Sequence, residues 1–347
     1  MSGLGISAIV PVYDGLGFLR RSLPPLLALR DRGALVEVLV VDDGSRDGSG
    51  AWAEGQGARL LHTGGRVGPG AARNLAAREA QGEILWFVDA DVVVHPEAVD
   101  HLLAAFADPG VVAVFGSYDD APPHPGFASQ YMNLRHHHVH HQAPGEATTF
   151  WAGCGAVRRE AFLGCGGYDA ERFARPSVED IELGLRLRRA GGRILLVPEM
   201  QGTHLKVWSL PGVVRTDLTC RALPWSRMLM RDPGAELDLN AGSGERGKAV
   251  LAGLLVLSLP MALLGGPLLL APPTLFLLAL VVNRRLFALF RRRRGLGFAL
   301  GALAFHQLYY LYSGAVFAWC WVEHRLGLGP PVQSVEPVEP EGRGSVT

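Results

Sequence analysis

Two carboxylates two residues apart, Asp89 and Asp91, stand directly after the apolar run Ile84–Val88. This arrangement can hold a hard divalent cation, because Mg²⁺ binds one or two carboxylates together with the phosphate oxygens of a substrate. The same triplet is also typical of a solvated turn after a strand. A second acidic turn, Asp42-Asp43-Gly44-Ser45, follows the apolar run Val36–Val41 and is open to the same two interpretations.

These acidic residues fall at the ends of β-type runs that alternate with helical runs. Asp14 follows the first β-type run, Ile6–Val10, which we expect to end at Pro11. The rhythm predicts an α/β fold with a mostly parallel, Rossmann-like sheet and crossover helices. In such sheets ligands bind at the carboxyl ends of the strands, which is where the carboxylates lie. The other predicted elements are helices over Phe18–Arg30, Pro69–Ala80 and Pro96–Ala107, and a strand over Val111–Phe115.

Four short segments occur in a fixed order, namely Pro11-Val12-Tyr13-Asp14, Val41–Ser45, Ala72-Arg73-Asn74 and Asp89-Ala90-Asp91. Jointly they resemble the family-2 glycosyltransferases, which have an A-type fold that binds nucleoside-diphosphate sugars. No G-x-G-x-x-G follows the first strand, which disfavours a dinucleotide-dependent dehydrogenase.

The resemblance implies a binding site for a nucleoside-diphosphate sugar and a divalent metal, Mg²⁺ or Mn²⁺. In the family, the carboxylates after the first two strands contact the base and ribose. The first Asp of the D-x-D triplet lies near the ribose, and the second binds the metal that bridges the diphosphate. Carried over, this assigns the nucleotide to Pro11, Tyr13, Asp14, Asp42, Asp43 and Asp89, and the metal to Asp91. Arg73 either helps to hold the nucleotide or is an exposed helix residue.

Two downstream segments resemble the acceptor side of the same family. Phe150–Arg159, which contains Trp151 and Gly153, has small residues that would let the backbone approach the transferred sugar. Ser177–Leu183 matches the family's Glu-Asp motif at the start of a helix. The resemblance makes Asp180 the base that takes the proton of the acceptor hydroxyl, with Glu179 beside it on the acceptor side. The alternative is that both are acids stabilised at a helix N-terminus.

His204 follows a strand-like run, Arg193–Pro198. Some transferases of this fold use a histidine near here as a metal or diphosphate ligand, and the alternative is a packed or surface histidine. Trp225 ends a segment similar to the Q-R-x-R-W motif of processive synthases, although the Gln and the second Arg are missing. It either packs against the acceptor or anchors a membrane interface. The histidines of 136–141 favour a groove lining or a surface helix over a zinc site.

The composition changes near residue 249. Ala249–Asn283 and Gly295–Val322 hold 35 and 28 residues without a charge, more than the roughly 20 that span a bilayer. We therefore expect transmembrane helices over 249–265, 267–283 and 296–322. They would follow a catalytic domain over 1–232 and a connector over 233–248, and precede a disordered tail over 323–347.

Basic residues flank the first apolar stretch on both sides, with Arg246 and Lys248 before it and six Arg residues between Arg284 and Arg294. By the positive-inside rule both flanks stay in the cytoplasm, which predicts a hairpin that turns near Gly265. The expected location is thus the cell membrane, with several passes and a cytoplasmic catalytic domain. The net charge of zero gives no reason to expect nucleic acid as a partner.

These observations predict a membrane-bound inverting glycosyltransferase that moves a sugar from a nucleoside-diphosphate sugar to the hydroxyl of a lipid or lipid-linked acceptor. A polyprenyl-phosphate glycosyltransferase is one alternative, but its ionised phosphate acceptor needs no base such as Asp180. A processive polysaccharide synthase is another, weakened by the incomplete Trp225 motif. The third is a membrane scaffold that binds nucleotide sugars without catalysis.

Overall fold

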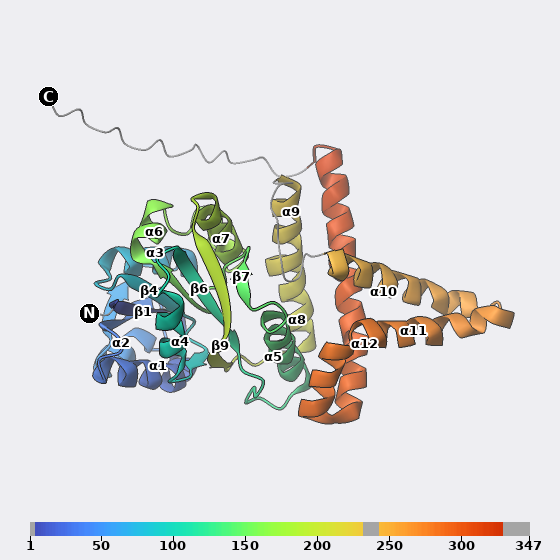
Figure 1. Cartoon of the computed structure of the whole chain (residues 1–347), viewed down its shortest axis with the longest axis horizontal. Coiled ribbons are helices and arrows are strands. Elements are labelled where there is room, and N and C mark those ends of the chain that lie inside the picture. The colour runs from blue at the N-terminus through green and yellow to red at the C-terminus, as the bar shows by residue number, and fades with distance from the viewer. Residues whose placement is uncertain (1–3, 232–242, 329–347) are drawn as a thin grey trace.

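The computed structural model describes residues 4–231 and 243–328 of the 347-residue chain. An α/β domain built on one nine-stranded sheet is followed by long helices that lie against one side of it (Figure 1). Most of the predicted connector, 233–242, and most of the predicted tail, 329–347, fall outside the described residues.

The sheet has the strand order β3-β2-β1-β4-β8-β6-β9-β5, with β7 paired to β9. Strands β3, β2, β1 and β4 pair in parallel, as does β6 with β9, whereas β8, β5 and β7 pair antiparallel to their neighbours. The sheet is therefore mixed, and the prediction of a mostly parallel sheet was wrong for the pairings of β8, β5 and β7. The strands are β1 (Ile6–Val12), β2 (Glu37–Asp42), β3 (Arg59–His62), β4 (Ile84–Val88), β5 (Val92–Val94), β6 (Val111–Tyr118), β7 (Gly145–Ala147), β8 (Cys154–Arg158) and β9 (Arg193–His204).

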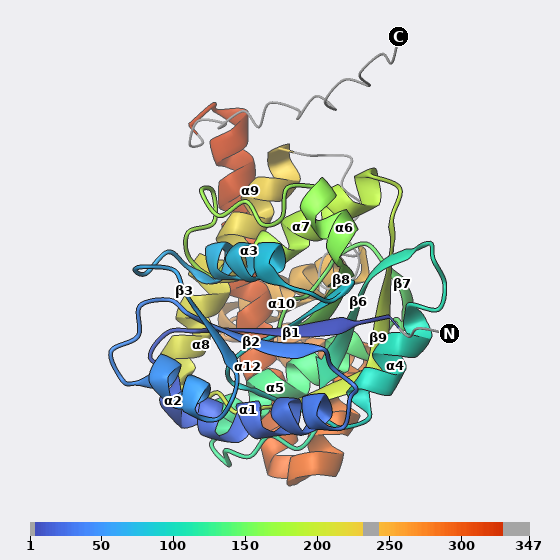
Figure 2. The ribbon, with the colours of Figure 1, turned by 90° about the vertical axis from the view of Figure 1, so that its left-hand side faces the viewer.

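Helices cover both faces of this sheet (Figure 2). One face packs against α1 (Leu16–Asp31), α2 (Ser49–Gly55) and α4 (Ala98–Ala105). The other packs against α3 (Pro69–Glu79), α6 (Arg159–Gly164) and α7 (Glu179–Arg189). Because successive strand residues point to opposite faces, each strand supplies both cores.

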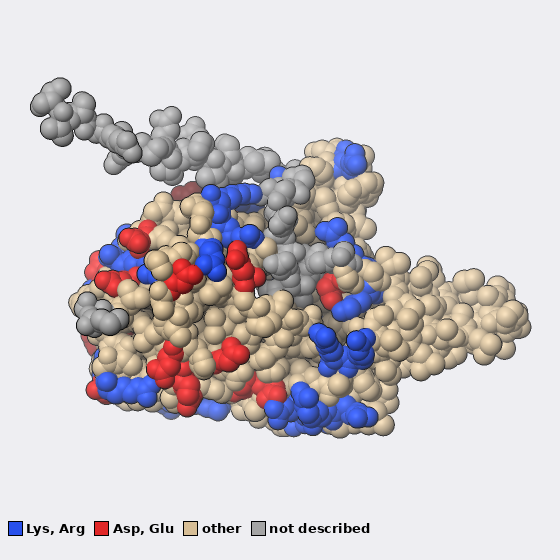
Figure 3. Space-filling model, in the orientation of Figure 1, with Lys and Arg blue, Asp and Glu red and all other residues tan. Residues whose placement is uncertain are grey.

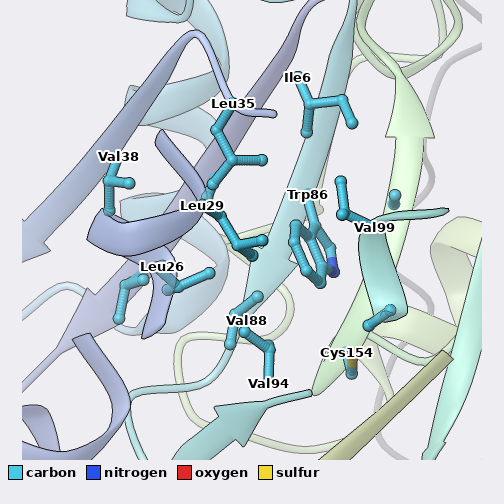
Figure 4. Close-up of a cluster of buried hydrophobic side chains, with 14 of the residues drawn as sticks. Ile6, Leu26, Leu29, Leu35, Val38, Trp86, Val88, Val94, Val99 and Cys154 are labelled. Atoms are coloured by element: carbon cyan, nitrogen blue, oxygen red, sulfur yellow. The ribbon is translucent and has the colours of Figure 1, made fainter. Parts of the chain in front are cut away.

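Trp86 shows how the first core is filled. Its side chain is completely buried on β4 and lies among aliphatic side chains from β1, α1 and α4, including Ile6, Leu29 and Val99 (Figure 4). The neighbouring residue Phe87 faces the second core, where its ring lies 5.4 Å from that of Phe162. The central strands are apolar on both faces and are therefore buried between the two helix layers. Because β2, β1 and β4 run parallel, their carboxyl ends lie at the same edge of the sheet.

The element bounds agree closely with several predictions. β4 spans the predicted Ile84–Val88, and α1 and α3 lie within two residues of their expected ends. β1 continues past Pro11 to Val12. Proline has no N–H to donate, but a strand tolerates it at a position where the sheet requires no hydrogen bond from that N–H. The short elements α2, β3, β5 and β7 were not predicted, because three to seven residues carry too little periodicity.

The C-terminal part is helical. The helix α5 (Phe127–His140) comes between β6 and β7 in the chain. After β9 the chain forms α8 (Leu210–Thr216), the π-helical turn η1 (Asp217–Ala222) and α9 (Leu223–Arg231). Then α10 (Ser243–Ala262), the 3₁₀ turn η3 (Gly266–Leu270) and α11 (Ala271–Val282) form a hairpin that projects from the body (Figure 1). The last helix, α12 (Arg284–Arg325), bends at Gly295, where φ is 83°.

The helix α12 lies along the α/β domain. Near its start, Arg293 Nε donates to Asp120 Oδ2 at 2.6 Å, and near its end Glu323 accepts from Arg227 of α9 at 2.8 and 2.9 Å. A span over 296–322 would put these two ends on opposite sides of a bilayer. The structure therefore does not support that predicted span, and the helix continues three residues into the predicted tail.

The second predicted span, 267–283, is divided between η3 and the 12-residue α11. Among the described residues, no single helix is both long and apolar enough to cross a membrane. The segments Gly266–Val282 and Arg284–Arg325 reach that standard only as a pair, and they are bent by 81°.

Candidate active site

Asp14 and Tyr13 form the exposed lip of the site after β1. Asp14 has a φ of 47°, and its Oδ1 accepts a hydrogen bond from Arg46 N at 2.7 Å. The Tyr13 ring is 38% exposed and lies under the Arg66 guanidinium, 4.1 Å from its carbon to the ring centroid. An exposed ring and a guanidinium at the ends of parallel strands can hold a planar, anionic ligand. Pro11 is buried in the strand behind them.

Asp42 and Asp43 are nearly buried and hold the surrounding loops. Asp42 Oδ1 accepts from Ser45 N at 2.8 Å. The two oxygens of Asp43 accept from Val67 N and Gly68 N, each at 2.9 Å. Asp43 thus fixes the glycine-rich entry to α3. A Cβ at Gly68 would lie 2.4 Å from a backbone oxygen, so this entry requires glycine.

Arg73 of α3 is buried, which excludes the alternative of an exposed helix residue. Its Nη2 lies 2.5 Å from Asp89 Oδ1, and its guanidinium lies 5.5 Å from the Tyr168 ring centroid. Burial disfavours the charged form of Arg73, but Asp89 and then the more distant carboxylates raise its pKa. Burial raises the pKa of Asp89, against the effect of Arg73. The pair places one fixed cation beside the D-x-D triplet.

Asp91 is brought next to His204 by the antiparallel pairing of β5 with the end of β9, in which Val92 lies opposite His204. His204 Nε2 lies 3.4 Å from Asp91 Oδ2. Burial opposes ionisation of Asp91, but the hydrogen bond and charge of His204 outweigh it and lower the pKa of Asp91. Asp91 is therefore ionised at neutral pH.

The orientation of His204 is set by two residues. Its Nδ1–H donates to Asn133 Oδ1 at 2.6 Å, and its ring stacks on Tyr118 at 4.2 Å with an interplanar angle of 3°. With Nδ1 occupied, Nε2 is the nitrogen that faces Asp91. A carboxylate oxygen and an oriented imidazole nitrogen suit a divalent metal whose other ligands come from a diphosphate. The described residues contain no cluster of three or more His, Cys, Asp or Glu that could hold a metal by itself.

Asp180 lies in the first turn of α7. Its Oδ1 accepts from Ile181 N at 2.9 Å and its Oδ2 from Ala152 N at 3.3 Å. Burial, and then the charge of neighbouring Glu179, raise the pKa of Asp180 to about 7. Glu179 is itself buried, its Oε2 accepts from Ser177 N at 2.6 Å, and burial raises its pKa. The side chain of Asp180 lines a pocket, so it is not only an acid at a helix N-terminus.

Trp151 and Gly153 lie between the two carboxylate sites. Gly153 O accepts from Asp89 N at 3.2 Å. A Cβ at Gly153 would lie 2.3 Å from the Trp151 ring, so that ring occupies the space that a side chain would need. Trp151 in turn packs edge-on against Tyr118, 4.8 Å between ring centroids. The Trp151 ring therefore connects the metal side of the site with the pocket.

The pocket has a volume of about 620 Å³ and lies between the α/β domain and the C-terminal helices. The domain contributes Asp180, Trp151 and parts of α5, while η1 and α9 contribute Arg221 and Trp225. The residues from α10 and α12 that line it are Glu245, Arg246, Ala249, Val250, Tyr309, Tyr310, Ser313, Gly314 and Phe317.

Residues 7–164 match the family model described as glycosyl transferase family 2. Over this segment the chain is similar to that family. Its fold is also that of a solved mannosyltransferase from Pyrobaculum calidifontis in complex with GDP-Man and Mn²⁺. The two chains are 20% identical, with a TM-score of 0.56 over 92% of this chain and 88% of the other, a likeness that shows the A-type fold.

Curated relatives of the glycosyltransferase domain have sugar-transfer names. The pre-mycofactocin glycosyltransferase of Mycobacterium tuberculosis is 28% identical over 220 residues, which cover 58% of this chain and 44% of the relative. The O-antigen biosynthesis protein RfbC of Myxococcus xanthus is 31% identical over 221 residues, which cover 57% of this chain and 17% of the relative. The aligned part thus spans less than half of either relative.

Several residues that build this candidate site could not be found from the sequence. Asn133 and Tyr118 orient His204, but neither belongs to a motif. Two of the clustered histidines, His136 and His140, line the pocket. They lie four residues apart on α5 and therefore on the same face of that helix. The pocket wall from α12 was missed because a span was expected there.

Proposed function

We propose that this chain is a metal-dependent, inverting glycosyltransferase that moves a sugar from a nucleoside-diphosphate sugar to the hydroxyl of a lipid or lipid-linked acceptor. One observation carries the proposal. Asp180, whose pKa is raised to about 7, lines a pocket that reaches the C-terminal helices, and the segment Ala152–Gly153 contacts both Asp180 and Asp89. A carboxylate with a pKa near the working pH is well suited to act as a general base.

On the donor side, Tyr13 and Arg66 offer a stacking surface for the base. Asp14 and Asp89 offer hydrogen-bond acceptors for the ribose hydroxyls. Asp91 and His204 would hold the divalent metal, Mg²⁺ or Mn²⁺, as the Mn²⁺ and GDP-Man of the Pyrobaculum enzyme support. When bound, the metal neutralises the charge that develops on the leaving diphosphate.

On the acceptor side, Asp180 takes the proton of the acceptor hydroxyl while the oxygen attacks the anomeric carbon. The attack comes from the face opposite the diphosphate, and the electron pair of the broken C–O bond leaves with the diphosphate oxygen, so the configuration inverts. Glu179 supports this step because its charge helps to keep the Asp180 carboxylate basic. A phosphate acceptor would need no such base, which favours a hydroxyl acceptor over the polyprenyl-phosphate alternative.

We place the enzyme at the cytoplasmic face of the cell membrane, attached by the α10–α11 hairpin. The projecting hairpin shows no charged side chain on its visible face, and Lys and Arg side chains gather beside its base (Figure 3). Reporters fused after Arg294 and after Leu328 should both be cytoplasmic. Near its start α12 contacts Asp120 of the domain, and near its end it contacts α9, which packs on the domain through Met228. An external reporter after Leu328 would instead support the multi-pass topology expected from the sequence.

The experiment that tests the function uses a panel of nucleotide sugars with purified protein, Mn²⁺ and a membrane lipid extract. Transfer should give a lipid product one sugar heavier, detected by mass spectrometry, and slow hydrolysis of the same donor should occur without lipid. Binding of nucleotide sugars with neither hydrolysis nor transfer would favour the scaffold alternative.

A further inference from the structure

The pocket beside Asp180 is lined by both polar and apolar side chains. Asp180 and His136 are polar groups on the side of the α/β domain. Ala249, Gly314 and Phe317 are the small and apolar residues of the wall from α10 and α12, which also carries Glu245, Arg246 and two tyrosines. A volume of about 620 Å³ lies within the range of small-ligand sites. The pocket can thus contact a polar group at Asp180 and an apolar group at the helices.

Two small residues, Ala249 of α10 and Gly314 of α12, face each other in the helical wall of the pocket. A Cβ placed on Gly314 would lie 3.9 Å from Ala249 Cβ, and it would meet nothing closer. The two helices therefore approach each other where neither carries a large side chain. A bulky side chain at either position would fill the pocket from that wall while leaving the catalytic carboxylates untouched.

The apolar wall continues out of the pocket along α10. Val250 lines the pocket and is 63% exposed, and Leu254 and Leu257 follow at 50% and 63%. These positions are spaced by four and three residues, so they lie on one face of the helix. An apolar stripe therefore leads from the pocket toward the tip of the hairpin, where Leu263 is 88% exposed.

Basic residues outnumber acidic ones at the base of this stripe, where Glu245 is paired with Lys248. Arg246 lines the pocket one turn before Val250, and Lys248 lies beside it on the same helix. Arg284 and Arg285 follow the other arm of the hairpin where it rejoins the body. Cations at the foot of an apolar projection complement the anionic head groups of a membrane surface.

We propose that this pocket is the acceptor site and that it takes an amphipathic lipid, a refinement that rests on the proposed function. The hydroxylated head lies against Asp180, where the base takes its proton. The alkyl chain lies against the wall that contains Ala249 and Gly314 and leaves along the stripe of Val250, Leu254 and Leu257. The catalytic domain thus receives its acceptor from the bilayer through the base of the hairpin.

The test is photo-crosslinking of the full chain in lipid nanodiscs, with a hexadecanol that carries a diazirine on its chain as the probe. Label should appear in peptides that contain residues 249–254 and 309–317. Ala249→Trp and, from the opposite wall, Gly314→Leu should each reduce that label at least fivefold. Ala262→Trp is the matched control, because it adds the same side chain to α10 outside the pocket, and it should label like the wild type.

Label confined to the hairpin tip, or unchanged label in both pocket variants, would overturn the proposal. Circular dichroism and thermal melts of each variant identify any loss caused by unfolding, and the two variants fill the pocket from different helices. Donor hydrolysis by the wild type is measured in parallel. Hydrolysis with no pocket label refutes the lipid site alone, whereas pocket label without hydrolysis or transfer by any donor refutes the proposed function alone.

Discussion

At the residue scale, two carboxylates of the same site, Asp91 and Asp180, have pKa values shifted in opposite directions. Asp91 has a lowered pKa because His204 faces it, whereas Asp180 has a raised pKa because it is buried beside Glu179. An anionic oxygen is needed where a metal binds, and a proton acceptor where a hydroxyl is deprotonated. The two environments thus suit the two carboxylates to different tasks.

The base assignment predicts a specific defect. Asp180→Asn keeps the shape of the side chain and removes the proton acceptor, so turnover should fall by ~10²- to 10⁴-fold. The dissociation constant of the nucleotide should change little, because Asp180 lies on the acceptor side. Steady-state kinetics and calorimetric binding measure the two effects. A proportional loss of nucleotide affinity would identify Asp180 as a donor-binding residue.

The pKa of Asp180 also predicts a pH profile. A base must be deprotonated to act, so kcat/KM should rise with pH and level off above the raised pKa, which is about 7. The acidic limb of the profile should disappear in Asp180→Asn. An unchanged limb in that variant would mean that another group titrates.

Asp91 should be required for the metal. Asp91→Ala removes the ionised oxygen that faces His204 Nε2, so Mn²⁺ binding by calorimetry and transfer activity should both be lost. A chelator should have the same effect on the wild type. The control is Asp31→Ala, which removes an exposed carboxylate far along α1 and should leave both unchanged. Full activity of the wild type in excess chelator would contradict metal dependence.

At the element scale, the pairing of β6 with β9 positions much of the metal side. Tyr118 at the end of β6 stacks on His204 at the end of β9, so the register of these two strands decides where the imidazole lies. That register shifts between Phe115 and Ser117, at Gly116. A Cβ at Gly116 would lie 1.7 Å from Met200 O, so the close approach of the strands requires glycine.

Gly116→Ala should therefore destabilise the domain by about 1–3 kcal/mol, as overpacking of a tight core does. Thermal or denaturant unfolding followed by intrinsic fluorescence measures the effect. Gly164→Ala in α6 is the control, because nothing lies within 4 Å of a Cβ there, and its stability should not fall. An unaltered stability of Gly116→Ala would show that β6 and β9 can separate without loss.

At the scale of the whole molecule, the hairpin has the dimensions of a partial insertion. The uncharged part of α10, Ala249–Ala262, is about 21 Å long and α11 about 18 Å, at 1.5 Å per residue. Both are shorter than the roughly 30 Å hydrocarbon core of a bilayer. These lengths are compatible with the attachment proposed above, in which the hairpin enters the membrane from one side.

Arginines next to the hairpin should contribute to membrane binding. Replacing Arg291 and Arg292, both exposed, by Ala should weaken binding to vesicles that contain anionic lipid, at about 1 kcal/mol per Arg. Cosedimentation with phosphatidylglycerol vesicles at two salt concentrations measures this loss. The double variant of Arg20 and Arg21, two arginines on α1, is the control and should bind as the wild type does. Equal binding by both double variants would remove the electrostatic part of the proposed attachment.

The sequence by itself determined the features that depend on neighbours along the chain. Ile84–Val88 is apolar throughout, so it forms a buried strand, and the carboxylates Asp89 and Asp91 necessarily follow it at the end of the sheet. The Glu179-Asp180 pair likewise begins a helix because apolar residues recur behind it at helical spacing. The motif order also pointed to the family whose model the domain matches.

Only the tertiary structure decided which distant residues meet. His204 faces Asp91 across 113 positions because β9 returns antiparallel to β5, and strand direction leaves no local mark in a sequence. Arg73 is buried because α3 packs over the strand that ends at Asp89. An uncharged run such as 296–322 has the same composition whether it lies in lipid or along a domain. The ion pair between Arg227 and Glu323, a contact between chain segments far apart, decided that α12 lies along the domain.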